Sequence, residues 1–252
     1  MQFQAHKGVS TEAPENTMPA FVLAVKQGYD LIELDVGVTA DRRFVLLHDD
    51  TMNRTGRDAD GNPLAEEMKL SDLTYEEVRK YDFGVWFGGQ FRGTRITLLE
   101  DVLNLAQRAG IRIKLDNKFW RFSEAELEAF FTLLKPYGEI LAFTCAELRC
   151  VEIANARFPE SEIHYDGPVT EQMLGDLTTM VGSRRLVVWL PLRNSHTSWA
   201  KGPFADEQLA ALVRKYARLG IWILSEAEEY ETAVRYGADI LETNGEIKPV
   251  HR

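Results

Sequence analysis

The stretch Leu31-Ile32-Glu33-Leu34-Asp35-Val36 alternates apolar and acidic side chains. In a β-strand, residues two apart point to the same face. The alternation therefore places Ile32, Leu34 and Val36 on one face of a strand. An apolar face packs against helices, so we expect Glu33 and Asp35 to point the other way, together.

Short apolar runs of the same kind recur along the chain and alternate with amphipathic stretches. This rhythm is typical of parallel strands connected by helices. Eight strands and seven helices are predicted, which favours an α/β fold, a (β/α)8 barrel of about 250 residues, over a doubly wound sheet with fewer strands. The predicted strands are residues 3–6, 31–38, 112–118, 139–144, 162–165, 186–190, 221–225 and 239–242, and the predicted helices are residues 16–27, 98–109, 123–134, 147–158, 170–177, 206–219 and 226–236.

One segment, residues 51–97, interrupts this rhythm with glycine, aspartate, proline and aromatic residues. It is too short to bury a core of its own. We therefore expect a short insertion after the second strand, lying over one mouth of the barrel. Residues 1–252 are predicted to form a single barrel domain.

The overall composition excludes several classes of protein. The 252 residues include 29 basic and 39 acidic side chains, a net charge of −10, so a nucleic-acid partner is not expected. The chain has neither a long apolar run nor a cationic, apolar leader, so we expect no stable membrane insertion and a cytoplasmic location. Cys145 and Cys150 are expected to be reduced packing residues.

A second charged pattern follows at residues 111–118. Strand alternation turns Arg112, Lys114, Asp116 and Lys118 toward the barrel interior. An inward row of charges is costly unless the charges are paired, so it indicates a function. Two interpretations are open at this point, a metal site or an internal network of salt bridges.

The metal interpretation brings together Glu33, Asp35 and Asp116 at one mouth of the barrel. Three carboxylates make an all-oxygen site that suits Mg²⁺ or Ca²⁺. His6 and His48 each close an apolar run, and strand ends are where such barrels carry their active sites. An acid and a base beside a metal are the minimum equipment for cleaving an ester. The other histidines, His164, His196 and His251, are expected to be structural or surface residues.

Several motifs in register resemble the glycerophosphodiester phosphodiesterase family. The resemblance is strongest over residues 3–118. The motifs are Ala5-His6-Lys7-Gly8, Pro14-Glu15-Asn16-Thr17, Gly28-Tyr29-Asp30-Leu31-Ile32-Glu33-Leu34-Asp35-Val36, His48-Asp49 followed by Arg54-Thr55, Ile96-Thr97-Leu98-Leu99-Glu100-Asp101-Val102-Leu103 and, later, Trp222-Ile223-Leu224-Ser225. Ordered motifs together are far more specific than any one alone.

The resemblance implies a TIM barrel that uses a divalent metal to hydrolyse glycerophosphodiesters to glycerol phosphate and an alcohol. His6 and His48 match the acid/base pair of the family. Glu33 and Asp35 match two of its metal ligands, and Asp116 stands where the family has a glutamate, one methylene longer. The partner implied is a small phosphodiester, and the oligomeric state is not indicated.

Substrate contacts are implied in the same way. Lys7 stands where the family usually has arginine, which replaces a bidentate grip on phosphate by a point charge. Lys118, two residues after Asp116, matches the lysine of the third strand. Asn16 and Trp222 are expected near the substrate.

Three alternatives remain beside simple hydrolysis. The same motifs resemble the sphingomyelinase D and phospholipase D toxins, so a transesterase that releases a cyclic phosphate is one alternative. A catalytically dead barrel that binds a phosphodiester is another, although a binder does not require both histidines and all three carboxylates. A two-carboxylate glycosidase would leave the histidines and inward lysines idle. For the diesterase we expect attack by the substrate's own neighbouring hydroxyl, because the matched motifs place no serine, threonine or cysteine as nucleophile.

Overall fold

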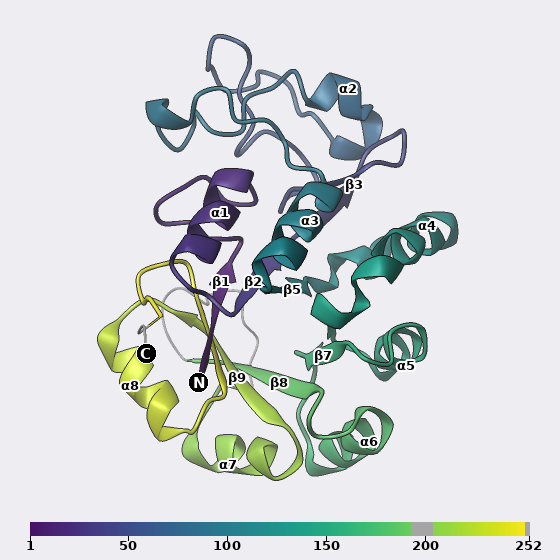
Figure 1. Cartoon of the computed structure of the whole chain (residues 1–252), viewed down its shortest axis with the longest axis vertical. Helices are drawn as coiled ribbons and strands as arrows, with labels where there is room; N and C mark the ends of the chain where they lie inside the picture. Colours follow the sequence, from purple (N-terminus) through teal and green to yellow (C-terminus); the bar gives the residue numbers. More distant parts are fainter. Residues whose placement is uncertain (193–203, 250–252) are drawn as a thin grey trace.

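The computed structural model describes residues 1–192 and 204–249. Eight parallel strands close into a barrel with helices around it (Figure 1), which confirms the predicted (β/α)8 fold. Around the barrel the order is β1-β10-β9-β8-β7-β6-β5-β2. The barrel strands are β1 (Gln2–His6), β2 (Leu31–Leu34), β5 (Arg112–Leu115), β6 (Leu141–Cys145), β7 (Glu162–Tyr165), β8 (Leu186–Pro191), β9 (Arg218–Leu224) and β10 (Ile240–Thr243).

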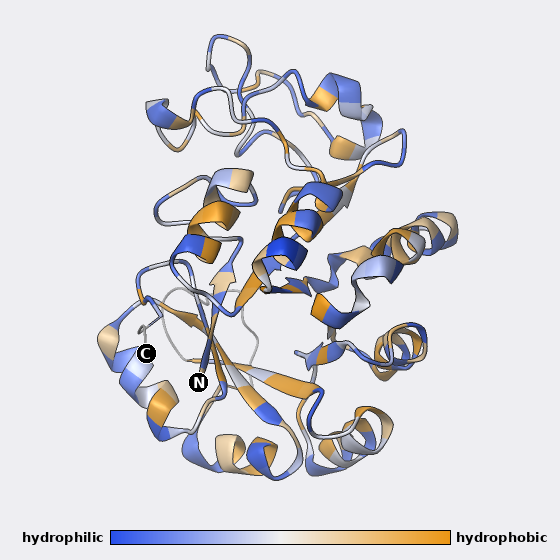
Figure 2. Cartoon of the chain, viewed as in Figure 1, coloured by the Kyte–Doolittle hydropathy of each residue, from blue (hydrophilic) through white to orange (hydrophobic). Residues whose placement is uncertain are grey.

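The helices cover the outside of the barrel and bury their apolar faces against it (Figure 2). Several ends follow from local chemistry: Ser123 and Glu126 form a capping box at the start of one helix. Gly110 ends another in the left-handed conformation, at φ 67°. The long helices are α1 (Met18–Lys26), α3 (Leu99–Ala109), α4 (Glu124–Leu134), α5 (Leu148–Arg157), α6 (Glu171–Val181), α7 (Glu207–Tyr216) and α8 (Ala227–Arg235).

Two predicted strands are shorter than expected. The predicted strand 31–38 divides at Asp35 into β2 and β3 (Val36–Val38), and β3 pairs antiparallel with β4 (Phe44–Leu46) outside the barrel. The division has a local cause, because the backbone N–H of Asp35 donates to the Asn16 side chain instead of to a neighbouring strand. The predicted strand 112–118 ends at Leu115, and a 3₁₀ turn over Asn117–Arg121 follows. The predictions for the ends of both strands were wrong.

The insertion contains α2 (Tyr75–Val78) and lies beside α1 and α3, outside the ring of helices (Figure 1). Its residues 69–71 line a second pocket together with His48 and Lys118. The β3–β4 hairpin carries the chain outward there. Within the insertion and at its root, a small apolar cluster forms from Val45, Leu47, Met52, Leu70, Val78, Phe83 and Ile96.

The barrel interior is unusually polar. At its N-terminal end, Arg112 and Arg218 both pair with Glu162, at 2.5 and 2.6 Å. An apolar layer of Leu31, Val187 and Ile240 lies beside Trp189, and the Trp189 indole stacks under the Lys114 ammonium at 4.3 Å. The large indole fits because β9 has Gly220 opposite it, where a Cβ would lie 2.5 Å from the ring.

Inside this core, His164 is fully buried and both of its ring nitrogens are satisfied. The Trp189 N–H donates to Nδ1 at 2.9 Å, and Nε2 lies 3.2 Å from a Glu162 oxygen. Because an indole N–H can only donate, Nδ1 must be unprotonated, which makes the ring neutral with its proton on Nε2. Burial lowers the pKa of His164 to about 4. The prediction of a structural role for His164 fits this arrangement, whereas His196 and His251 lie outside the described residues.

The close approach at Gly220 predicts a stability effect. Substitution Gly220→Ala should lower the free energy of unfolding by about 1–3 kcal/mol, because the new methyl collides with a buried, hydrogen-bonded indole. The control is Gly175→Ala, in the middle of α6 with open space around its Cβ position, which should raise stability by about 0.5–1 kcal/mol. Chemical denaturation measures both. Equal effects of the two substitutions would contradict the packing argument.

The neutral His164 predicts a pH dependence of stability. Below its ordinary pKa of 6.5 the unfolded chain takes up a proton here, whereas the folded protein does not until about pH 4. The free energy of unfolding should therefore fall as the pH drops from 6.5 toward 4. His164→Gln should flatten this slope. An NMR titration of the wild-type ring provides a direct check, and titration near pH 6.5 would contradict the prediction.

Candidate active site

A pocket of about 670 Å³ opens at the C-terminal ends of the barrel strands. It gathers eight of the nine site residues that the sequence predicts, from segments far apart in the chain. These are His6, Lys7, Glu33, Asp35, His48, Asp116, Lys118 and Trp222. The ninth, Asn16, is not among the residues that line it.

Three of these residues, Glu33, Asp35 and Asp116, form a compact carboxylate cluster whose oxygen atoms lie within 4.8 Å of one another. Burial and the neighbouring carboxylates raise the pKa of Glu33 well above its ordinary value. Burial and Asp35 raise the pKa of Asp116 in the same way. Burial would raise the pKa of Asp35 too, but the Lys118 ammonium, 2.8 Å away, holds it below its ordinary value. A cation at this cluster would relieve the repulsion, and its hard oxygen donors are those that Mg²⁺ and Ca²⁺ prefer.

The alternative of an internal salt-bridge network is only partly realised. Of the three inward cations, Lys118 alone makes an ion pair with this cluster. Arg112 pairs with Glu162 at the opposite end of the barrel. Lys114 lies 3.6 Å from Glu242, on the other side of the pocket. The carboxylate cluster therefore carries more negative charge than its direct contacts neutralise.

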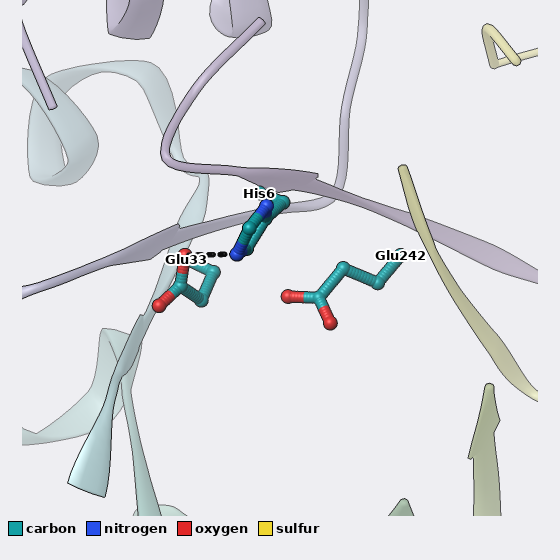
Figure 3. A group of neighbouring side chains, drawn as sticks. All are labelled: His6, Glu33 and Glu242. Carbon is teal, nitrogen blue, oxygen red and sulfur yellow. Dashed lines mark ion pairs between the residues drawn. The ribbon is translucent and has the colours of Figure 1, made fainter. Parts of the chain in front are cut away.

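His6, at the end of β1, has a defined tautomer. Its Nδ1 lies 2.7 Å from Oδ1 of Asn244, and the Ser10 hydroxyl donates to the same oxygen. Because Asn244 offers an acceptor there, Nδ1 of His6 carries the proton and Nε2 is free to accept one. Nε2 faces the pocket, 3.9 Å from Glu33 (Figure 3). Burial lowers the pKa of His6 below its ordinary value, which favours this neutral form.

Glu242, on β10, is a site residue that the sequence analysis missed. It points toward His6 and Glu33 (Figure 3), and ligand atoms of the three side chains lie within 4.8 Å of one another. Gln4 donates to its Oε1 at 2.7 Å, and Lys114 lies beside it. The sequence could have identified Glu242, because alternation along the predicted strand 239–242 turns Glu242 to the same, inward face as Ile240.

His48 reaches the pocket from outside the barrel, directly after the β3–β4 hairpin. Its Nδ1 lies 2.6 Å from a carboxylate oxygen of Asp49, which orients the ring. Its backbone carbonyl accepts a hydrogen bond from Lys118 at 2.7 Å. Lys118 therefore joins the loop that carries His48 to the metal-ligand candidate Asp35.

Asn16 lies next to Asp35 and holds its carboxylate and its backbone. It is buried behind Asp35, to which its side chain donates at 2.8 Å, while its Oδ1 accepts the Asp35 backbone N–H at 3.2 Å. Its own backbone lies in the left-handed region, at φ 55°, where asparagine is tolerated better than most residues. Asn16 thus orients a carboxylate and is not among the residues that line the pocket, and its contact with substrate stays a prediction.

Further residues that line the pocket but were not expected as site residues include Asn117, Arg121, Asp166 and Trp189. Asp166 follows β7, and burial raises its pKa to about 6. Its hydrogen bond to the Asn117 amide is long, at 3.4 Å. Asn117 and Arg121 come from the 3₁₀ turn that replaces the end of the predicted third strand.

Known proteins are similar to part of this sequence, and solved structures are similar to its fold. The glycerophosphoryl diester phosphodiesterase family model matches residues 6–135. A glycerophosphodiester phosphodiesterase of Caldanaerobacter subterraneus is 43% identical over 101 residues, 40% of this chain and 38% of that protein. One of Bacillus altitudinis is 39% identical over 127 residues, 48% of each. The chain thus spans less than half the length of these curated relatives.

Solved structures resemble the whole barrel. A phosphodiesterase of Oleispira antarctica, solved with its product sn-glycerol-3-phosphate, has a TM-score of 0.75 at 21% identity and covers 97% of this chain and 93% of its own. A glycerophosphodiester phosphodiesterase of Thermotoga maritima has a TM-score of 0.68 at 21% identity, covering 97% and 95%. At these identities the likeness concerns the fold.

Proposed function

The chain belongs to the glycerophosphoryl diester phosphodiesterase family, and from this we propose that it hydrolyses glycerophosphodiesters to glycerol phosphate and an alcohol. One observation carries the proposal: the pocket brings together two histidines, three clustered carboxylates and two lysines from distant parts of the chain. A protein that only binds a diester has no need of this combination. A glycosidase that uses two carboxylates would have no catalytic role for the histidines and lysines of the pocket.

Glu33, Asp35 and Asp116 are the residues that would hold a divalent metal, Mg²⁺ or Ca²⁺. The fit rests on their oxygen donors, their spacing and the unneutralised charge of the cluster. When bound, such an ion would stabilise the negative charge that grows on a phosphate oxygen. Lys7 and Lys118 line the same pocket and would bind the other phosphate oxygens, and Trp222, which also lines it, would contact the alcohol group.

The two histidines take different parts in proton transfer. Nε2 of His6 can accept a proton, because Nδ1 donates to Asn244, so we assign His6 as the general base. Asp49 at Nδ1 of His48 stabilises the imidazolium in the way that an aspartate supports a catalytic histidine, so we assign His48 as the general acid toward the leaving alcohol.

The attacking group comes from the substrate. Among the described residues, the pocket is lined by no serine, threonine or cysteine. The hydroxyl next to the esterified one in a glycerol diester is held within reach of phosphorus, with an effective molarity of up to about 10⁵–10⁸ M. We infer that this hydroxyl attacks first and that water opens the cyclic phosphate afterwards. A transesterase would differ only in releasing the cyclic product.

We expect the protein to act on a small-molecule substrate and to be located in the cytoplasm. Cys145 and Cys150 are both free thiols in the structure, and a reducing compartment would keep them so. No helix in residues 1–192 and 204–249 is both long and apolar enough to span a bilayer. The net charge of −10 gives no attraction for nucleic acid.

The activity and its metal dependence can be tested together. A panel of glycerophosphodiesters should be cleaved, chelation should abolish cleavage, and Mg²⁺ or Ca²⁺ should restore it. A rise in melting temperature on adding the ion, lost in Glu33→Gln, measures metal binding without activity. Phosphorus NMR identifies the product as glycerol phosphate or a cyclic phosphate. Full activity in excess chelator would contradict the metal assignment, and binding without turnover would indicate a dead barrel.

The histidines give a separate prediction. His6→Ala and His48→Ala should each lower kcat by about 10²–10⁴, the usual contribution of a positioned acid or base. Arg79→Gln is a control, because Arg79 pairs with Glu76 on the exposed surface of the insertion. Near-normal kcat in His48→Ala would remove it from the catalytic assignment.

A further inference from the structure

A single side chain connects two loops of the pocket. Arg54, at the root of the insertion, donates from both terminal nitrogens to the Glu15 carboxylate, at 2.8 and 2.7 Å. Its Nε donates to Asp49 at 2.6 Å. One guanidinium thus holds two carboxylates, one from the loop after β1 and one from the loop after β4.

Each carboxylate continues to a residue of the proposed machinery. The other Asp49 oxygen lies 2.6 Å from Nδ1 of His48. Glu15 lies 3.5 Å from the ammonium of Lys7. The result is a continuous chain of ionic contacts from His48 through Asp49, Arg54 and Glu15 to Lys7, which we call the Arg54 bridge.

The charges in the bridge explain why its centre is an arginine. Burial would raise the pKa of Glu15 and of Asp49, but the hydrogen bonds and charge of Arg54, together with Lys7 beside Glu15 and His48 beside Asp49, outweigh burial and keep both pKa values below their ordinary range. Both groups therefore remain anionic and would repel each other without the guanidinium between them. A lysine carries the same charge but cannot present a planar fork to two carboxylates at once.

The bridge is not needed to attach the insertion. Two hydrogen bonds already tie it to the β3–β4 hairpin: the Leu73 carbonyl accepts from the Ala40 N–H, and the Tyr75 N–H donates to the Asp41 carboxylate. The apolar cluster of the insertion also includes Val45 of β4. The side chain of Arg54 itself is 43% exposed. Its three short, charge-assisted bonds are therefore directed at the pocket loops and not at the core.

We propose that Arg54 is a positioning residue, which fixes the Asp49 carboxylate that orients His48 and sets the distance between His48 and the phosphate-binding Lys7. This inference rests on the proposed function. It predicts that the two ends of the bridge differ: loss of Asp49 affects the acid/base step and so kcat, whereas loss of Glu15 releases Lys7 and affects substrate binding and so KM.

The experiment measures kcat and KM for a glycerophosphodiester in the full chain with metal present. Arg54→Gln and Arg54→Lys should each lower kcat by about 10–100-fold, as misplacement of a supported catalytic group does. Asp49→Asn should lower kcat similarly, and Glu15→Gln should mainly raise KM. Arg79→Gln, which removes another carboxylate-paired arginine of the insertion, should change neither constant. Melting temperatures of all variants report on folding.

The decisive measurement is made in the His48→Ala background. If Arg54 acts through His48, adding Arg54→Gln should lower the residual kcat no further. An equal loss in both backgrounds would overturn the proposal, as would full activity of Arg54→Lys. If His48→Ala alone keeps a normal kcat, the assignment of His48 as general acid in the proposed function is wrong. The bridge is then tested by the KM of Arg54→Gln, which should rise if Arg54 positions Lys7. A normal KM in that case would overturn the bridge as well.

Discussion

Buried negative charge at the C-terminal mouth of the barrel is the constraint on which the rest of the structure depends. Glu33, Asp35 and Glu242 are almost completely buried within one pocket. Such charges are tolerated only where cations and hydrogen bonds offset them. Lys118 meets Asp35 and Lys114 meets Glu242, whereas Glu33 has the backbone N–H of Lys7 and raised proton affinity. This uneven compensation leaves a cluster of acidic groups that could hold a cation.

The polar interior of the barrel follows from the same constraint. Lys114 must lie deep to reach Glu242, and its ammonium is stabilised there by the face of the Trp189 indole. The indole in turn needs Gly220 for space and His164 as a hydrogen-bond acceptor. His164 contacts Glu162, and Glu162 forms ion pairs with Arg112 and Arg218. A chain of polar contacts thus runs through the barrel and supports the carboxylates from below.

Strand alternation was enough to predict the barrel and the inward face of Glu33, which lies within β2. Asp35 and Asp116 directly follow the last residues of β2 and β5, so alternation named them although they lie just outside the strands, and they still join Glu33 in the cluster. The same rule would have found Glu242. It could not find the β3–β4 hairpin, since the division at Asp35 depends on a side chain, Asn16, that is distant in sequence. Nor could it place the insertion or Asn244, because loops that follow strands have no periodicity. The family motifs supplied Lys7 and Trp222, which alternation alone does not single out.

This difference between strands and loops also explains how the site is divided. Residues on strand ends, such as Glu33 and His6, are fixed by the barrel itself and by neighbours within hydrogen-bond distance. His48 and Lys7 are on loops, with Lys7 in the left-handed region at φ 59°, so their positions need separate support. Lys118 and the Arg54 bridge supply it by charge-assisted bonds between loops. A barrel of this kind can therefore keep its carboxylate cluster unchanged while its loops, and the groups that contact the substrate, are rearranged around it.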